Sequence, residues 1–142
     1  MKTWLYIFLS LIILNNGCAN KEIDPPQPSD SLGISKTSSK KYSKYIVYHL
    51  GAHWCGPCQQ MIKLVWQDKE VIRELEKHDA KLLILDATKE KDKKYFAYYN
   101  VRSYPTILIL ERKDLTKHLV RRVGYMSKRD VLSTIERYSR NL

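Results

Sequence analysis

Two cysteines separated by two residues stand between an apolar segment and a helical pattern. Residues 45–50 (YIVYHL) are rich in β-branched and aromatic side chains and predict a buried strand that ends at Gly51. Cys55 and Cys58 follow at once. Pro57 between them suits the first turn of a helix, where its missing N–H costs nothing. The chain is therefore expected to turn sharply from a strand into a helix at the cysteine pair.

The remainder of the chain alternates helical patterns with short apolar runs. The spacing of apolar side chains predicts a helix that begins near Pro57 and continues, after a second cap at Asp68, to Leu75. Further strands are predicted at 81–87, 106–110 and 116–123, and further helices at 91–99 and from Ser127 onward. This β-α-β-α-β-β-α order predicts an α/β fold, in which helices cover both faces of a mixed sheet of about four strands.

The first part of the 142-residue chain carries signals of export. Lys2 precedes an apolar run at 4–14, which is too short to cross a bilayer but suits a secretory signal. Gly17-Cys18 after this run resembles the lipobox of bacterial lipoproteins, in which the cysteine is lipidated. A signal with an incidental cysteine and an uncleaved anchor are the alternatives. We expect a signal peptide at 1–18, a flexible Pro/Ser-rich linker at 19–41 and one domain at 42–142.

Only Cys55 and Cys58 remain in the predicted domain, so their role can be argued from their position. Free N–H groups at a helix start stabilise a thiolate, which makes Cys55 the candidate nucleophile. Cys58 lies one turn further on, close enough to attack a mixed disulfide formed at Cys55. A zinc site that adds His49 and His53 is one alternative, although a strand would send His49 into the core and leave His53 at the surface. A structural staple is the other, but a disulfide that closes so small a loop restrains little chain entropy.

The residues around the pair carry a family resemblance. The segment WCGPC at 54–58 resembles the active site of thioredoxins, and further matches follow in order at 81–86, 103–106 (SYPT) and 123–124. The resemblance spans about 45–142 and implies a thioredoxin-like fold that catalyses thiol–disulfide exchange. It also implies that the Pro105 peptide bond is cis and faces the cysteines. The substrate groove that it implies consists of Trp54, Gly56, Pro57, Tyr104 and Pro105.

Two details set this chain apart from cytosolic thioredoxin. Residues 58–72 look more like exported and membrane-linked thioredoxin-like proteins, which include disulfide-interchange domains. His49 replaces the buried acid that thioredoxins carry six residues before the first cysteine. A neutral imidazole could accept the proton of Cys58, which makes His49 a candidate proton relay. The alternative is that His49 only packs and satisfies a local hydrogen bond.

We therefore expect a monomeric thiol–disulfide oxidoreductase that acts on exported proteins, without a cofactor or a metal. Reduction is favoured over oxidation because the Gly-Pro between the cysteines resembles reducing thioredoxins, and the electrons are expected from a membrane-embedded partner. The alternative is a non-catalytic thioredoxin-like binding module. The net charge of +10 is interleaved with acids and accompanies no nucleic-acid module, so it predicts a basic surface that favours anionic membranes or acidic partners. The expected location is outside the cytoplasm, facing a periplasm or at the cell surface, with the lipid of Cys18 as the membrane anchor.

Lipidation of Cys18 can be tested directly. Cys18→Ser removes the thiol that would carry the lipid, so the protein is expected to leave the membrane fraction and appear in the soluble fraction after cell lysis. Fractionation with immunoblotting measures this, and mass spectrometry of the mature N-terminus identifies the first residue. A wild-type protein that is already soluble and begins at another residue contradicts lipidation.

Overall fold

The computed structural model describes residues 24–27 and 43–140 of the chain. The helices and strands are β1 (Tyr45–Gly51), α1 (Gly56–Met61), the π-helix η1 (Ile62–Trp66), α2 (Lys69–Lys77), β2 (Ala80–Asp86), α3 (Glu90–Tyr98), β3 (Thr106–Glu111), β4 (Asp114–Val123) and α4 (Lys128–Arg140). The predicted α/β order is confirmed, and most predicted ends differ from these bounds by only one or two residues. No helix in the described ranges is long and apolar enough to cross a bilayer. The predicted signal peptide and most of the predicted linker lie outside these ranges.

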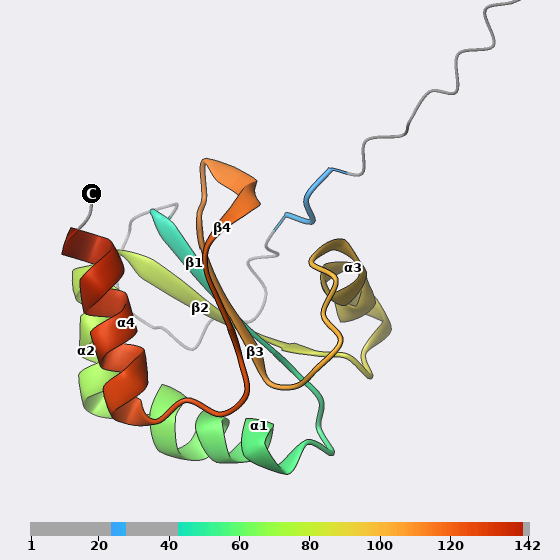
Figure 1. Cartoon of the computed structure of the whole chain (residues 1–142), viewed down its shortest axis with the longest axis horizontal. Helices are drawn as coiled ribbons and strands as arrows, with labels where there is room; N and C mark the ends of the chain where they lie inside the picture. Colours follow the sequence, from blue (N-terminus) through green and yellow to red (C-terminus); the bar gives the residue numbers. More distant parts are fainter. Residues whose placement is uncertain (1–23, 28–42, 141–142) are drawn as a thin grey trace, which may run out of the picture.

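β1 occupies an interior position in the sheet, whose order is β2-β1-β3-β4 (Figure 1). It runs parallel to β2 and antiparallel to β3, and each of its residues is buried. A strand that is covered on both faces needs apolar residues at successive positions, which explains why YIVYHL lacks the alternation of a surface strand. The register pairs Leu50 with Thr106. The segment before β3 therefore lies beside the loop that follows β1.

The helices cover the two faces of the sheet unequally. α1, η1, α2 and α4 lie on one face, and α3 lies on the other (Figure 1). Successive side chains of β1 point to opposite faces. Val47 packs in the core beneath η1, α2 and α4, whereas Tyr48 packs against Tyr95 and Tyr99 in the core beneath α3. His49 points to the same face as Val47, toward the helices that follow the cysteines.

The helical segment after the cysteines contains one feature that the sequence pattern did not predict. Residues 62–66 form the π-helix η1 instead of continuing the α-helix. Its i→i+5 hydrogen bonds widen the turn and shift the following side chains around the axis. The neighbouring side chains of Val65 and Trp66 are consequently both buried. The chain restarts as α2 after the predicted cap Asp68, whose Oδ1 accepts the N–H of Glu70 at 2.9 Å.

Candidate active site

The cysteine pair lies where the chain leaves β1 and enters α1. The N–H of Cys55 donates to the carbonyl of Ala52 at 3.0 Å, which closes the turn between the strand and the helix. Cys55 caps α1, because its Sγ accepts the N–H of Cys58 at 3.3 Å. Pro57 occupies the first turn, as predicted. Cys55 and Cys58 are joined by a disulfide.

The two sulfur-bearing residues differ in their access to solvent. Cys55 is 6% exposed, whereas Cys58 is fully buried. The N–H that contacts Cys55 Sγ belongs to the first turn of α1, and such a group stabilises a thiolate when the disulfide opens. Stepwise disulfide exchange requires one accessible sulfur that attacks first and a second sulfur within reach behind it. Cys55 Sγ, beside the N–H donor, suits the first role, and the buried Cys58 Sγ suits the second.

Tyr104 and Pro105 form the other side of the site. The peptide bond between them is cis, which confirms the expectation from the thioredoxin resemblance. Tyr104 packs against the cluster of Ala52 and the two cysteines. The carbonyl of Pro105 accepts the N–H of Gly124 at 2.8 Å, which ties the segment before β3 to the end of β4. The predicted groove residues are thus held at one end of the sheet.

Apolar side chains are exposed around this end. Trp54 is 66% exposed, and its ring lies 5.9 Å from that of Tyr104 in an edge-on contact. The ring centroid of Tyr104 lies in turn 5.6 Å from that of Phe96 in α3, again in an edge-on contact. Val123 and Tyr125, which flank Gly124, are also exposed, and neither was among the predicted groove residues. Large apolar side chains of this kind beside a reactive group can bind an extended peptide.

His49 lies behind the cysteines in the core. Its side chain is fully buried, and burial lowers its pKa to about 4. Nδ1 accepts a hydrogen bond from the indole Nε1–H of Trp66 at 2.9 Å. The sequence pattern placed Trp66 within a predicted helix and did not predict this contact with His49. Trp66 is the last residue of the π-helix η1, an element that the apolar spacing does not predict.

The four residues of the zinc alternative do not come together. His53 is exposed, and its Nδ1 lies 3.1 Å from Thr88 Oγ1, whereas His49 is buried as the strand pattern predicted. Within 24–27 and 43–140, no three His, Cys, Asp or Glu side chains are grouped to hold a metal ion. Cys18, the predicted lipidation site, lies outside these ranges.

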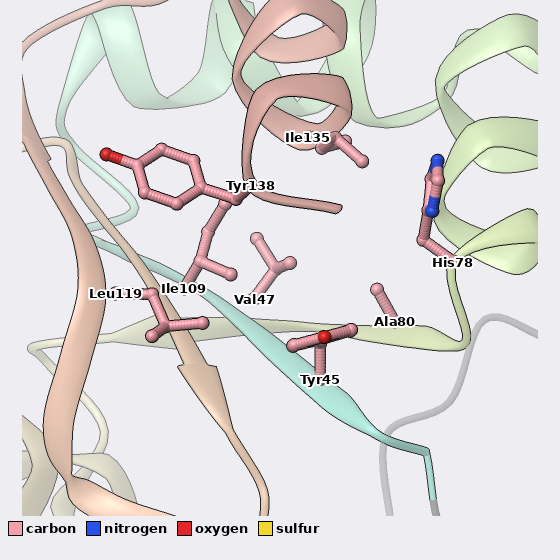
Figure 2. A pocket seen from close by; sticks show the side chains of 8 residues that line it. All are labelled: Tyr45, Val47, His78, Ala80, Ile109, Leu119, Ile135 and Tyr138. Atoms are coloured by element: carbon pink, nitrogen blue, oxygen red, sulfur yellow. The ribbon is translucent and has the colours of Figure 1, made fainter. Parts of the chain in front are cut away.

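A separate apolar hollow lies at the far end of β1. Figure 2 shows that it is lined by Tyr45 and Val47 of β1, by His78 directly after α2, and by side chains from β2, β3, β4 and α4. Its one imidazole, that of His78, lies 2.8 Å from the carboxylate of Glu74. None of the predicted site residues lines this hollow. It is therefore distinct from the site at the cysteines.

The sequence matches the Thioredoxin family over residues 36–137. The chain belongs to this family. It is 28% identical to a thioredoxin of Rickettsia typhi over 95 residues, which make up 65% of this chain and 79% of that protein. It is also 31% identical to a protein disulfide-isomerase of Ricinus communis over 112 residues, which make up 75% of this chain but only 22% of that protein. These similarities support membership of a thiol–disulfide oxidoreductase family.

Solved structures show the same fold. A mutant thioredoxin from Halobacterium salinarum NRC-1 has a TM-score of 0.51 at 23% identity, with 68% of this chain and 76% of that chain covered. The thioredoxin of Fasciola hepatica has a TM-score of 0.52 at 22% identity, with 68% and 82% covered. The predicted thioredoxin fold, a four-stranded mixed sheet with helices on both faces, is thereby confirmed.

Gly51 is a further residue that the site requires. A Cβ on this residue would lie 2.9 Å from Cys58 Sγ and 3.1 Å from His49 Nε2, so an alanine must displace buried atoms. We expect Gly51→Ala to lower the free energy of unfolding of the oxidised protein by about 1–3 kcal/mol. The matched control is Gly56→Ala, because no atom lies within 4 Å of a Cβ there, and we expect it to raise that free energy slightly. Urea denaturation measures both, and equal effects of the two substitutions would contradict the role of Gly51.

Proposed function

We propose that the protein is a thiol–disulfide oxidoreductase of exported proteins, in which Cys55 attacks and Cys58 resolves. The observation that carries this proposal is the disulfide at the start of α1, whose outer sulfur accepts a helix N–H beside the cis Tyr104–Pro105 bond. The exposed ring of Trp54 and the groove residues around it suit an extended peptide of the substrate. No bound metal or organic cofactor is needed for the exchange itself.

The reaction proceeds in two exchanges. The Cys55 thiolate of the reduced protein attacks one sulfur of a substrate disulfide, and the substrate's other sulfur leaves with the electron pair as a thiolate. The Cys58 thiolate then attacks Cys55 Sγ in the mixed disulfide, and the second substrate sulfur leaves in the same way. The substrate is reduced to two thiols, which take up protons from solvent, and Cys55–Cys58 is oxidised to the disulfide.

Reduction is the proposed direction, because Gly56-Pro57 resembles the residues between the cysteines of reducing thioredoxins. Each reduced substrate leaves the pair oxidised, so a dithiol donor must restore it. For an exported enzyme this donor is proposed to be a membrane-embedded protein, and the lipid on Cys18 would keep the enzyme near it. The apolar run at 4–14 with Gly17-Cys18 after it supports export and anchoring.

Single-cysteine variants test the two roles. Cys58→Ser removes the resolving thiol, so we expect mixed disulfides between Cys55 and exported proteins to accumulate, whereas Cys55→Ser is expected to trap almost none. Non-reducing electrophoresis followed by mass spectrometry measures the trapped species. A variant that lacks both cysteines gives the background from Cys18. Equal trapping by the two single variants contradicts the assigned roles, and trapping by neither favours the binding-module alternative.

The reduction potential of the Cys55–Cys58 pair tests the direction. A reductase is expected to have a potential near that of thioredoxin, about −270 mV, whereas a strong disulfide oxidant has about −120 mV. Equilibration of the full-length protein with glutathione or dithiothreitol buffers, followed by alkylation of free thiols, gives the value. A potential near the oxidant's value would reverse the proposed direction and leave the exchange chemistry intact.

A further inference from the structure

Only one of the two ring nitrogens of His49 has a partner. Nδ1 accepts the hydrogen bond from Trp66, but Nε2 is buried and has no hydrogen-bond partner in the described part of the chain. A buried polar atom without a partner costs free energy, so such an atom calls for a physical explanation. A partner that exists only in another redox state of the protein would supply one.

The contact with Trp66 fixes the position of the imidazole proton. An indole nitrogen can only donate, so His49 Nδ1 must present its lone pair to it. The ring is neutral near pH 7, because burial lowers the pKa of His49 to about 4. A neutral imidazole carries one proton, which is therefore on Nε2. The unpartnered atom is an N–H donor.

This donor and the inner sulfur border the same small space. A Cβ placed on Gly51 would lie 3.1 Å from His49 Nε2 and 2.9 Å from Cys58 Sγ. The nitrogen and the sulfur are therefore no further apart than the sum of these distances, a span that one water molecule can bridge. Sulfur in a disulfide is a weak acceptor, whereas a thiolate is charged and accepts strongly. Reduction of the pair would thus create an acceptor in front of the unpartnered donor.

We propose that His49 donates a hydrogen bond from Nε2 to the thiolate of Cys58, directly or through one water, and so promotes the second exchange. The inference rests on the proposed function, since it concerns the step in which Cys58 attacks the mixed disulfide. In that step Cys58 first gives its proton to solvent, the bond between Cys58 Sγ and Cys55 Sγ forms, and the bond between Cys55 and the substrate sulfur breaks. His49 keeps its own proton throughout.

This role differs from the proton relay that the sequence suggested. A relay needs a free lone pair on the nitrogen near Cys58, but the tautomer required by Trp66 puts a proton there and occupies the other nitrogen. The described titratable groups near Cys58 include Cys55 at the start of the same helix, Tyr104 before β3, and His49 on β1. For His49 itself, burial is the cause of the lowered pKa, and it keeps the ring neutral while Cys58 ionises.

The test uses the reduced full-length protein. The pKa of Cys58 is followed by the carbon-13 shift of its Cβ, and the proton positions of His49 by nitrogen-15 shifts. We expect the wild type to show Nε2 protonated and Nδ1 unprotonated throughout the titration of Cys58. His49→Leu removes the donor, and we expect it to raise the pKa of Cys58 by about one pH unit or more, since a hydrogen bond to a charged group is lost.

Three further variants separate this role from a structural one. His49→Gln offers an amide N–H near the position of Nε2, so it is expected to restore much of the wild-type pKa of Cys58. Trp66→Phe keeps an aromatic ring but frees Nδ1, so the proton is expected to distribute between both nitrogens and the pKa of Cys58 to rise by less than in His49→Leu. Tyr104→Phe removes only a hydroxyl and is expected to leave that pKa unmoved. If His49→Leu fails to fold, the pKa values of Cys58 in His49→Gln and Trp66→Phe still test the proposal.

Two results would overturn the proposal. One is a wild-type His49 that is protonated on Nδ1 or that takes up a proton as Cys58 ionises, which would instead establish a relay. The other is a Cys58 pKa that is the same in wild type and in every folded variant at His49 and Trp66. These measurements need no substrate, so they are independent of the proposed function. A chain that traps no substrate can still show the hydrogen bond, and a chain that traps substrates through Cys55 can lack it.

Discussion

The close approach of Gly51 to Cys58 is the contact on which the arrangement of the site depends. Any side chain at position 51 would come within 2.9 Å of the buried sulfur, so only glycine lets the start of α1 remain this close to the sheet. This closeness keeps Cys58 fully buried and leaves Cys55 as the outer sulfur. It also brings His49, which lies on the same face of β1 two residues earlier, next to the inner sulfur. The close approach of Gly51 to Cys58 therefore determines both the solvent exposure of the two cysteines and the position of the His49 imidazole beside the inner one.

A neutral imidazole at this position changes the energetics of the pair. Apolar surroundings raise the pKa of a thiol, which slows its attack, because only the thiolate is nucleophilic. A carboxylate in the place of His49 would repel the thiolate, whereas an N–H group attracts it. Stabilising a thiolate also makes a disulfide easier to reduce, but only to the extent that Cys58 is ionised in the reduced protein. The proposed hydrogen bond is thus compatible with a reducing pair on the condition that Cys58 is mostly a thiol in the reduced protein.

The sequence predicted the elements whose signals are local. The run YIVYHL predicts β1, because its residues suit a strand buried on both faces. The start of α4 follows from a cap at Ser127, whose hydroxyl donates a hydrogen bond to the Asp130 carboxylate at 2.6 Å. The cis bond at Pro105 was expected from the resemblance alone. The contact between Trp66 and His49 was not predicted, because apolar periodicity does not encode the wider turn of η1. The tautomer of His49 could not be inferred either, since it depends on that contact between residues far apart in the sequence.

The proposed reduction of substrates requires an electron donor that repeatedly returns the cysteine pair to the dithiol form. A lipid on Cys18 and a membrane-embedded donor would confine both partners to one layer, and a linker at 19–41 with a reach on the order of 50 Å would set their effective concentration. Gln27, which falls in the predicted linker, contacts α3, because the Tyr95 hydroxyl donates to its carbonyl at 2.6 Å. α3 covers the face of the sheet opposite to α1 (Figure 1). Gln27 therefore contacts the domain on the face of the sheet opposite to the helix that begins at the cysteines, whereas the next residue of α3, Phe96, reaches Tyr104 of the site.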